Sequence, residues 1–331
     1  MLYINFGGGK SYKMKLVKDK NYTEEHANTW DKLIEFEKIN HKSSFKKEGQ
    51  EIEWIFKGVT DSDYPLLTTL ERDIADIKGI NLNEKKNISE LRTLLQKGLK
   101  VEEGSKAISI YDIESGLIRK FKRQCHHYDI QTPEEDNILE WLALMRHYGA
   151  PTRLLDWTYS FYVALFFALS DATPGKACAV WALEQRSIKK QLQKRNSDIF
   201  KILEKDEHVT CKSWKRVFKR RKPHAFVYLV NPFRLHERLV IQQGNFLCPG
   251  DITKTFEENL AAVLPKRDKR KLFKYIIKCE PKHRRDILLH LHRMNINKAT
   301  LFPGLEGFTK SLKTLMFSPQ NLIKADLECK K

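Results

Sequence analysis

The chain has 331 residues, of which 41% are hydrophobic and 31% are charged. This composition is typical of a folded globular protein, and no apolar run approaches the roughly 18 residues that span a bilayer. Sixty Lys and Arg against 42 Asp and Glu give a net charge of +18, which favours a polyanionic partner.

Cysteine usage and the first residues indicate the compartment. The six cysteines lie far apart and never form a CxxC pair, so we expect reduced thiols, no zinc site and no disulfide framework. The opening MLYINFGGGKSYKMK lacks the order of basic, apolar and small residues that marks a secretory signal. These features predict a cytoplasmic protein.

The first third of the chain begins with a basic leader, residues 1–27, to which we assign no regular element. Its GGGKS is not a phosphate-binding loop, because Ile4 stands where that motif needs glycine. Residues 29–39 have the apolar spacing of an amphipathic helix, and 52–58 alternate as a strand that stops at Gly58. Residues 85–122 are expected to form helices with loops.

The middle of the chain has the most regular pattern. Pro133 suits the first turn of a helix that runs through Tyr148 and stops at Gly149. Residues 150–158 should be extended, since Ala150 precedes a proline. A core helix follows, with Ser160 as its N-cap.

The last third is expected to alternate strands with helices. Residues 177–184, 225–232 and 239–250 are predicted strands, the third interrupted by Gly244. Residues 269–278 place four apolar side chains on one helical face, which predicts a helix, and a final helix lies within 299–317. We divide the chain into the leader 1–27, a domain 28–315 with a basic helical insertion around 186–222, and a tail 316–331.

Four basic runs lie between residues 189 and 285, and each is either a solvated helix face or part of a nucleic-acid surface. Two of these runs supply the candidate nucleic-acid contacts, which are Lys215, Arg216, Lys219, Arg220, Arg221, Lys269, Arg270 and Lys271.

The stretch HYGAPTRLLDWT, residues 147–158, concentrates polar groups between two apolar helices and has two interpretations. In the structural one, Arg153 pairs with Asp156 to lock a corner, Asp156 or Thr158 caps the next helix and Trp157 is core. In the functional one, these side chains line a pocket beneath Trp157, because a buried polar cluster needs partners. The pocket would be lined by His147, Thr152, Arg153, Asp156 and Thr158.

Residues 140–172, EWLALMRHYGAPTRLLDWTYSFYVALFFALSDA, resemble the central block of the FRG domain, a bacterial family named for a Phe/Tyr-Arg-Gly tripeptide. WIFKG with YPLLTTLER, NPFRLHERLVIQQGNFLCPG and LFPGLEGFTKSL are similar to further blocks of the family, so the resemblance covers about 28–315. The tripeptide reads Phe56-Lys57-Gly58 here, and lysine keeps the charge but loses the planar fork of arginine.

The order of these blocks is similar in outline to the ADP-ribosyltransferase fold, which has a basic residue and Gly on an early strand, hydroxyls at a strand-to-helix corner and Glu or Gln on a late strand. The resemblance implies an α+β fold with a small split sheet flanked by helices. It also implies an NAD-using toxin or effector that modifies a macromolecule in anti-phage defence or a toxin–antitoxin system, and the spacing of His and Cys predicts no metal. The positive charge favours nucleic acid over protein as the target, and we expect RNA rather than DNA.

Displacing nicotinamide from NAD requires donors for the diphosphate, an aromatic ring beside the nicotinamide and a carboxylate or amide on a ribose hydroxyl. The resemblance assigns Lys57 and Arg153 to the first task, Trp157 or Tyr148 to the second, and Gln242, Gln243 or Glu237 to the third. The full candidate set is Gln242, Gln243, Arg153 and Asp156 for catalysis, and Lys57, Gly58, His147, Tyr148, Thr152, Trp157 and Thr158 for NAD.

Two other functions account for the same charge. A non-catalytic nucleic-acid-binding module would bind RNA or DNA in a salt-sensitive manner without any effect of NAD. A basic protein that docks an acidic antitoxin or chaperone would form a stable complex with that partner and bind nucleic acid weakly.

Overall fold

The structure is a computed structural model that describes residues 2–5, 11–16, 22–27, 29–44, 54–82, 84, 87–100, 102, 104–195, 197–206, 223–232, 237–264 and 271–316. Within this part of the chain, no helix is long and apolar enough to cross a membrane. The helices and strands together give the α+β class that the sequence predicts.

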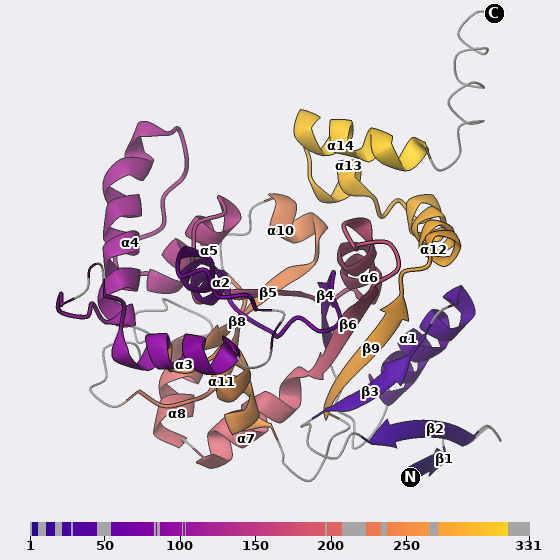
Figure 1. The fold of residues 1–331 in the computed structure, drawn as a ribbon, viewed down its shortest axis with the longest axis horizontal. Coiled ribbons are helices and arrows are strands. Elements are labelled where there is room, and N and C mark those ends of the chain that lie inside the picture. The colour runs from indigo at the N-terminus through magenta and orange to yellow at the C-terminus, as the bar shows by residue number, and fades with distance from the viewer. Residues whose placement is uncertain are drawn as a thin grey trace, which may run out of the picture.

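The described strands form one sheet in the order β1-β2-β3-β9-β6-β4-β5-β8-β7 (Figure 1). All neighbours are antiparallel except β3 and β9, which are parallel. The strands are β1 Leu2–Asn5, β2 Ser11–Leu16, β3 Thr23–His26, β4 Trp54–Val59, β5 Leu155–Thr158, β6 Ala177–Glu184, β7 Val227–Val230, β8 Gly244–Pro249 and β9 Leu272–Lys278.

The sheet is split between β4 and β5. These two strands share one register pair, Phe56 with Thr158, whereas β4 and β6 share six. The split separates β5, β8 and β7 from the six strands on the other side. The sheet has nine strands and is larger than the small sheet that the sequence resemblance implies.

Helices lie on both faces of the sheet and at its ends (Figure 1). They are α1 Trp30–Ser44, α2 Thr69–Ile77, α3 Asn87–Lys97, α4 Ile110–Gln124, α5 Ile138–His147, α6 Phe161–Ser170, α7 Gln185–Arg195, α8 Ser197–Asp206, α10 Glu237–Ile241, α11 Phe256–Val263, α12 Pro281–Arg293, α13 Lys298–Leu301 and α14 Leu305–Leu315.

Helix α6 packs directly on the sheet, and Gly58 allows the close approach. A Cβ atom at Gly58 would lie 2.0 Å from the Ala164 carbonyl oxygen, so a side chain there cannot be accommodated. The predicted cap is confirmed, because the Ser160 hydroxyl accepts from the Val163 amide at 3.3 Å. α6 is buried on nearly every side, as its apolar sequence predicts.

Residues 272–278 form strand β9, so the helix predicted at 269–278 is wrong there. A short apolar run fits either element by pattern alone, and β9 is covered on both faces. Tyr275 and Ile277 pack in one core cluster while Leu272 packs in the other. Even Lys274 is buried, with its ammonium 4.9 Å from the centre of the Trp181 ring.

Three other predicted boundaries are corrected. The helix expected from Pro133 begins at Ile138, since Asn137 is the N-cap and accepts from the Glu140 amide. The strand expected over 239–250 begins at Gly244, because the residues before it form the short helix α10. Residues 1–27, left without an element from sequence, contain β1, β2 and β3.

Candidate functional site

The α5–β5 corner carries most of the HYGAPTRLLDWT stretch and is fixed by backbone hydrogen bonds. Gly149 adopts φ +83°, and the Ala150 amide donates to the Met145 carbonyl at 2.9 Å, which ends α5. The fully buried Thr152 accepts from the Leu70 amide through its carbonyl oxygen at 3.1 Å. The corner is therefore tied to the start of α2.

Asp156 binds Arg146 and not Arg153. The Arg146 guanidinium donates to both Asp156 carboxylate oxygens, with Nε at 3.2 and 2.9 Å and Nη2 at 2.7 Å. Lys57 reaches across the split and donates through Nζ to the Asp156 carbonyl oxygen at 3.1 Å. Asp156 thus joins the last turn of α5 to β4 at the point where the sheet divides.

Four basic side chains influence this one carboxylate. Burial would raise the pKa of Asp156, but Arg146, Lys57 and Arg72 outweigh it and hold that pKa below its usual value. Burial lowers the pKa of Lys57 to about 8, an effect that Asp156 partly opposes. Burial also lowers the pKa of Arg238, which Asp156 likewise opposes. The excess of positive charge makes this cluster suited to an anionic ligand.

Two cavities adjoin the cluster. The smaller, about 150 Å³, is lined by Arg146, His147, Asp156, Arg238 and Gln242 with apolar neighbours from α5 and β8. The larger, about 650 Å³, lies among α6, α10, α13 and α14 and shares His147 and Arg238 with the first. Its volume is within the roughly 300–1,000 Å³ typical of small-molecule sites.

The larger cavity has aromatic and charged walls. The Arg238 guanidinium lies 4.3 Å from the centre of the Phe302 ring, and Phe167 meets the same ring edge-on at 6.0 Å. Lys298 pairs with Asp171 at 2.8 Å, which links α13 to the end of α6. Glu237 also lines this cavity, as does Glu306. α13 and α14 thus cover one side of the site.

Arg153 has a structural environment, and the Arg153–Asp156 pair expected from sequence is wrong. Its side chain is 1% exposed and forms a two-point ion pair with Glu114 of α4, with Nε at 2.7 Å from Oε1. Its Nη1 donates to the Pro249 carbonyl at 3.4 Å, and its guanidinium lies 5.9 Å from the centre of the Tyr111 ring. The structure does not bring Arg153 together with Asp156 and the cavities.

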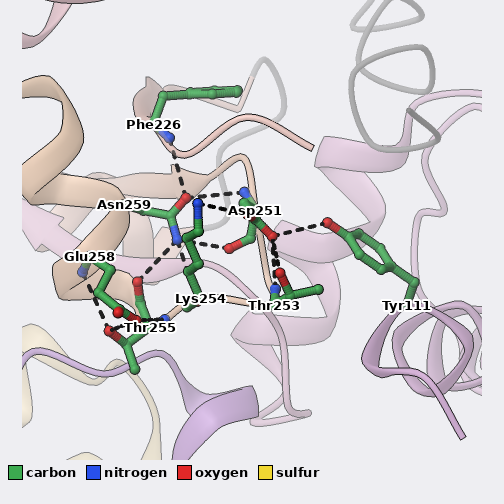
Figure 2. A network of polar contacts seen from close by, with 8 residues as sticks. All are labelled: Tyr111, Phe226, Asp251, Thr253, Lys254, Thr255, Glu258 and Asn259. Atoms are coloured by element: carbon green, nitrogen blue, oxygen red, sulfur yellow. Dashed lines mark hydrogen bonds and ion pairs between the residues drawn. The ribbon is translucent and has the colours of Figure 1, made fainter. Parts of the chain in front are cut away.

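Tyr111 also belongs to a network of polar contacts that follows β8 (Figure 2). Tyr111 donates to the Asp251 carboxylate at 3.5 Å, and the same carboxylate accepts from the Thr253 amide and hydroxyl at 3.0 and 2.6 Å. The Asn259 carboxamide accepts from the Phe226 and Asp251 amides at 3.2 and 3.1 Å. These contacts fix the turn from β8 to α11.

Some of the other predicted site residues contribute to packing, and others line a cavity. Trp157 is core, 3% exposed, and the Thr158 hydroxyl donates to the Gln242 carbonyl at 2.7 Å. Gln243 is exposed with φ +47°, and Tyr148 is 54% exposed beside the His147 ring. Thr152 and Gly58 contribute to the packing described above. Of the predicted residues, His147, Asp156 and Gln242 line a cavity, and Lys57 lies beside Asp156.

The candidate nucleic-acid contacts Lys215, Arg216, Lys219, Arg220, Arg221, Lys269 and Arg270 lie outside the described residues. Lys271 is described, and its ammonium pairs with Glu184 at 2.5 Å. No group of three metal-ligating side chains occurs in the described part of the chain.

Sequence reasoning missed Arg72, Arg146 and Arg238. Arg146 stands in the last turn of α5, and its link to Asp156 requires the chain reversal between them. Arg238 and Gln242 are four residues apart, a spacing that brings them to one face of a helix. That signal was hidden because the segment has the apolar content of a strand.

A comparison with protein families matches residues 52–177 to the FRG domain. No curated protein and no solved structure gives a significant match to the chain. The matched region begins before β4, includes Lys57, Arg72, Arg146 and Asp156, and ends at the start of β6. Residues 52–177 of the chain therefore carry an FRG domain.

Proposed function

We propose that this protein is an ADP-ribosyltransferase that uses NAD to modify nucleic acid, RNA before DNA. The observation that carries the proposal is the cluster of Lys57, Arg146 and Arg238 around Asp156 at the split, beside two cavities. Cationic donors in a cleft are what a dinucleotide diphosphate requires. We propose anti-phage defence or a toxin–antitoxin system as the biological setting.

The position of the sequence blocks supports this proposal. The Phe56-Lys57-Gly58 tripeptide is on β4, the corner with Thr158 and Ser160 follows β5, and the Gln242-Gln243 pair precedes β8. These strands are neighbours in the order β4-β5-β8. Three segments that are far apart in sequence and belong to the same implied active site therefore meet at the split.

The residues have distinct tasks in the proposed reaction. Lys57 and Arg238 bind the diphosphate, and Arg146 holds Asp156 in place. Asp156 is ionised at neutral pH because its pKa lies below the usual value. A carboxylate at this position stabilises the positive charge that develops on the ribose carbon as nicotinamide leaves. His147 and Phe302 contribute walls to the larger cavity.

The net charge of +18 favours nucleic acid as the acceptor. Arg153 has no part in this mechanism, since its guanidinium is committed to Glu114.

The test is incubation of the purified protein with labelled NAD and total RNA, DNA or cell lysate. Arg238→Ala removes a cleft cation, and Arg119→Ala removes an exposed cation from α4 as the matched control. We expect label on RNA with wild type and the control, and at least about a tenfold loss with Arg238→Ala. Thermal unfolding checks that both variants are folded.

The strong positive charge also favours the non-catalytic alternative. If no macromolecule is labelled and salt-dependent RNA binding is equal in all three proteins, the chain is a nucleic-acid-binding module. Weak RNA binding together with a stable complex with an acidic protein favours the docking function instead.

A further inference from the structure

The two cavities beside Asp156 share His147 and Arg238 among the described residues that line them. His147 is the last residue of α5, and Arg238 lies in α10. Asp156 lines the smaller cavity, so in the proposed reaction this cavity surrounds the ribose carbon that nicotinamide leaves. A second substrate that attacks this carbon can reach it from the larger cavity, past His147 and Arg238.

The larger cavity is suited to a nucleobase. Phe167 and Phe302 provide aromatic walls, and bases of any identity stack on aromatic rings. The volume of about 650 Å³ is that of a site for a small organic ligand, a class that includes a single nucleotide. Lys57 is not among the described residues that line this cavity, so a diphosphate bound between Lys57 and Arg238 leaves it open to the acceptor.

Transfer to a base requires a group that accepts a proton where the two cavities meet. The attacking nitrogen of a base N–H group must lose its proton as it bonds to the ribose carbon. Of the two shared residues, Arg238 cannot take this proton, because a guanidinium stays protonated in proteins. Histidine changes its charge near neutral pH and is the side chain used most often as a general base. His147 is therefore the suitable residue.

The other ionisable groups around the two cavities are less suited to this task. Asp156 lines only the smaller cavity and, although burial opposes it, the basic neighbours of this carboxyl hold its pKa below the usual value. Three further carboxylates line only the larger cavity, and two of them are ion-paired. Asp171 pairs with Lys298, Glu306 pairs with Lys310, and the exposed Glu237 begins α10.

We propose that the larger cavity receives a nucleobase of the acceptor RNA and that His147 is the general base that takes its proton. This inference rests on the proposed function. A base nitrogen bonds to C1′ of the nicotinamide ribose, and the bond from C1′ to nicotinamide breaks with its electron pair passing to the nicotinamide ring. The proton of the base N–H group moves to an imidazole nitrogen of His147 and from there to solvent.

Two substitutions test His147, with His127→Gln at an exposed histidine as the matched control. At saturating labelled NAD and RNA, His147→Gln should transfer label about 100-fold more slowly than wild type. Its affinity for NAD, measured by calorimetry, should stay within about twofold of wild type. Added imidazole should restore part of the transfer rate of His147→Ala, because it replaces the missing base.

The pH profile separates a base from a merely structural residue. The transfer rate of wild type should rise from about pH 5.5 to about pH 7.5 as histidine loses its proton, and His147→Gln should lack this rise. This range lies below the pKa of Lys57, which is about 8, so Lys57 keeps its charge throughout.

Phe167→Leu tests the acceptor site, because it removes an aromatic wall and leaves the contact of Arg238 with Phe302 in place. Phe308→Leu, at a half-exposed position of α14, is the matched control. Phe167→Leu should raise the KM for RNA about tenfold and leave the affinity for NAD unchanged. Thermal unfolding checks that all variants are folded.

The outcomes separate the inference from the proposed function. If wild type transfers label and His147→Gln is equally fast, or loses affinity for NAD in parallel with its rate, His147 is not the base and the proposed function stands. If Phe167→Leu weakens the binding of NAD and not of RNA, the larger cavity belongs to NAD and its assignment to the acceptor is wrong. If wild type labels no RNA, both the inference and the proposed function are wrong.

Discussion

At the scale of single residues, burial determines the charge of Lys57 beside Asp156. Burial lowers the pKa of this amine to about 8, so a fraction of it is neutral just above physiological pH. Arginine, which the family tripeptide has at this position, stays charged at any pH that proteins tolerate. The lysine therefore makes the affinity for an anion depend on pH.

We expect the affinity of wild type for NAD to fall as pH rises through about 8, because deprotonation removes the charge of Lys57. The Lys57→Arg variant should bind NAD with little change from pH 7 to 9. Calorimetric titrations across this range test the difference, with Lys120→Arg on the exposed face of α4 as control. Equal pH profiles for wild type and Lys57→Arg would contradict the role of Lys57 in binding.

Gly58 is required by packing, and the effect of adding one methyl group should be large. In Gly58→Ala the new Cβ would clash with backbone atoms of α6, with the Ala164 oxygen 2.0 Å and the Ala168 nitrogen 2.6 Å away. We expect the free energy of unfolding to fall by about 3 kcal/mol or more, because backbone cannot move aside cheaply.

The control for Gly58 is Gly116→Ala, in the middle of α4, where a Cβ meets nothing within 4 Å. Alanine should stabilise that helix by about 0.5–1 kcal/mol. Urea unfolding of both variants measures the two effects. If Gly58→Ala is as stable as wild type, the close approach of β4 and α6 is not what the glycine provides.

At the scale of elements, the N-termini of α2 and α11 are joined by carboxylates. Glu71 caps its own helix by accepting from the Thr68 amide at 2.6 Å, and its other oxygen accepts from the Phe256 amide of α11 at 2.7 Å. In return, Glu257 of α11 accepts from the Leu66 amide at 2.9 Å. These bonds connect segments about 185 residues apart in sequence, which holds the FRG domain against the later part of the chain.

The contacts of Glu71 between α2 and α11 should make the free energy of unfolding depend on pH. Burial raises the pKa of Glu71 from 4.5 to about 7 in spite of its hydrogen bonds, so the folded state retains a proton that the unfolded state loses. The free energy of unfolding should therefore decrease as pH rises from 4.5 to 7, with Glu71 contributing on the order of 3 kcal/mol. The partly buried Glu25, whose pKa is also raised to about 7 by burial, adds to the same slope.

We expect Glu71→Gln to remove the larger part of this slope and leave the part that belongs to Glu25. Thr68→Ala serves as control, because it weakens the same cap by about 1 kcal/mol but keeps the carboxyl group. Guanidinium unfolding at several pH values measures the slopes. A Glu71→Gln slope equal to that of wild type would show that Glu71 does not titrate in this range.

Elements with a clear local pattern of apolar residues could be predicted from the sequence. Elements and residue pairs that depend on tertiary contacts could not. The core helix α6 and the strand β6 have long apolar patterns with clear ends, and both lie where predicted. The run LFKYIIK lacks the alternation of a strand with one exposed face, because its side chains are buried on both faces of the sheet. Arg146 and Asp156 meet because the chain reverses direction between them. Arg153 is nearer to Asp156 in sequence but pairs with Glu114, and no local sequence pattern indicates that pairing.

At the scale of the whole molecule, the positive charge and the site have different locations in sequence. The FRG match includes most of the Asp156 cluster, whereas the densest basic runs come after it. The acceptor and NAD are therefore expected to be bound by different parts of the chain. Removing the basic residues within 215–221 should weaken RNA binding and leave NAD affinity unchanged.

This separation gives a salt-dependence prediction. For a protein bound to single-stranded RNA, each phosphate contact contributes about −0.7 to the slope of log K against log salt. Replacing five basic residues by Gln should reduce the magnitude of this slope by up to about 3.5. Filter binding at salt concentrations from about 50 to about 200 mM measures the slope. The five are Lys215, Arg216, Lys219, Arg220 and Arg221.

A matched five-residue variant on α4 and α12 has the same loss of charge at exposed positions outside residues 215–221. Its members are Arg119→Gln, Lys120→Gln, Arg123→Gln, Lys282→Gln and Arg285→Gln. If contact with RNA is local to residues 215–221, the matched variant keeps a steeper slope than the first. Equal slopes would show that RNA responds to the total charge of +18 alone, and the acceptor would then have no defined binding surface on the basic segment.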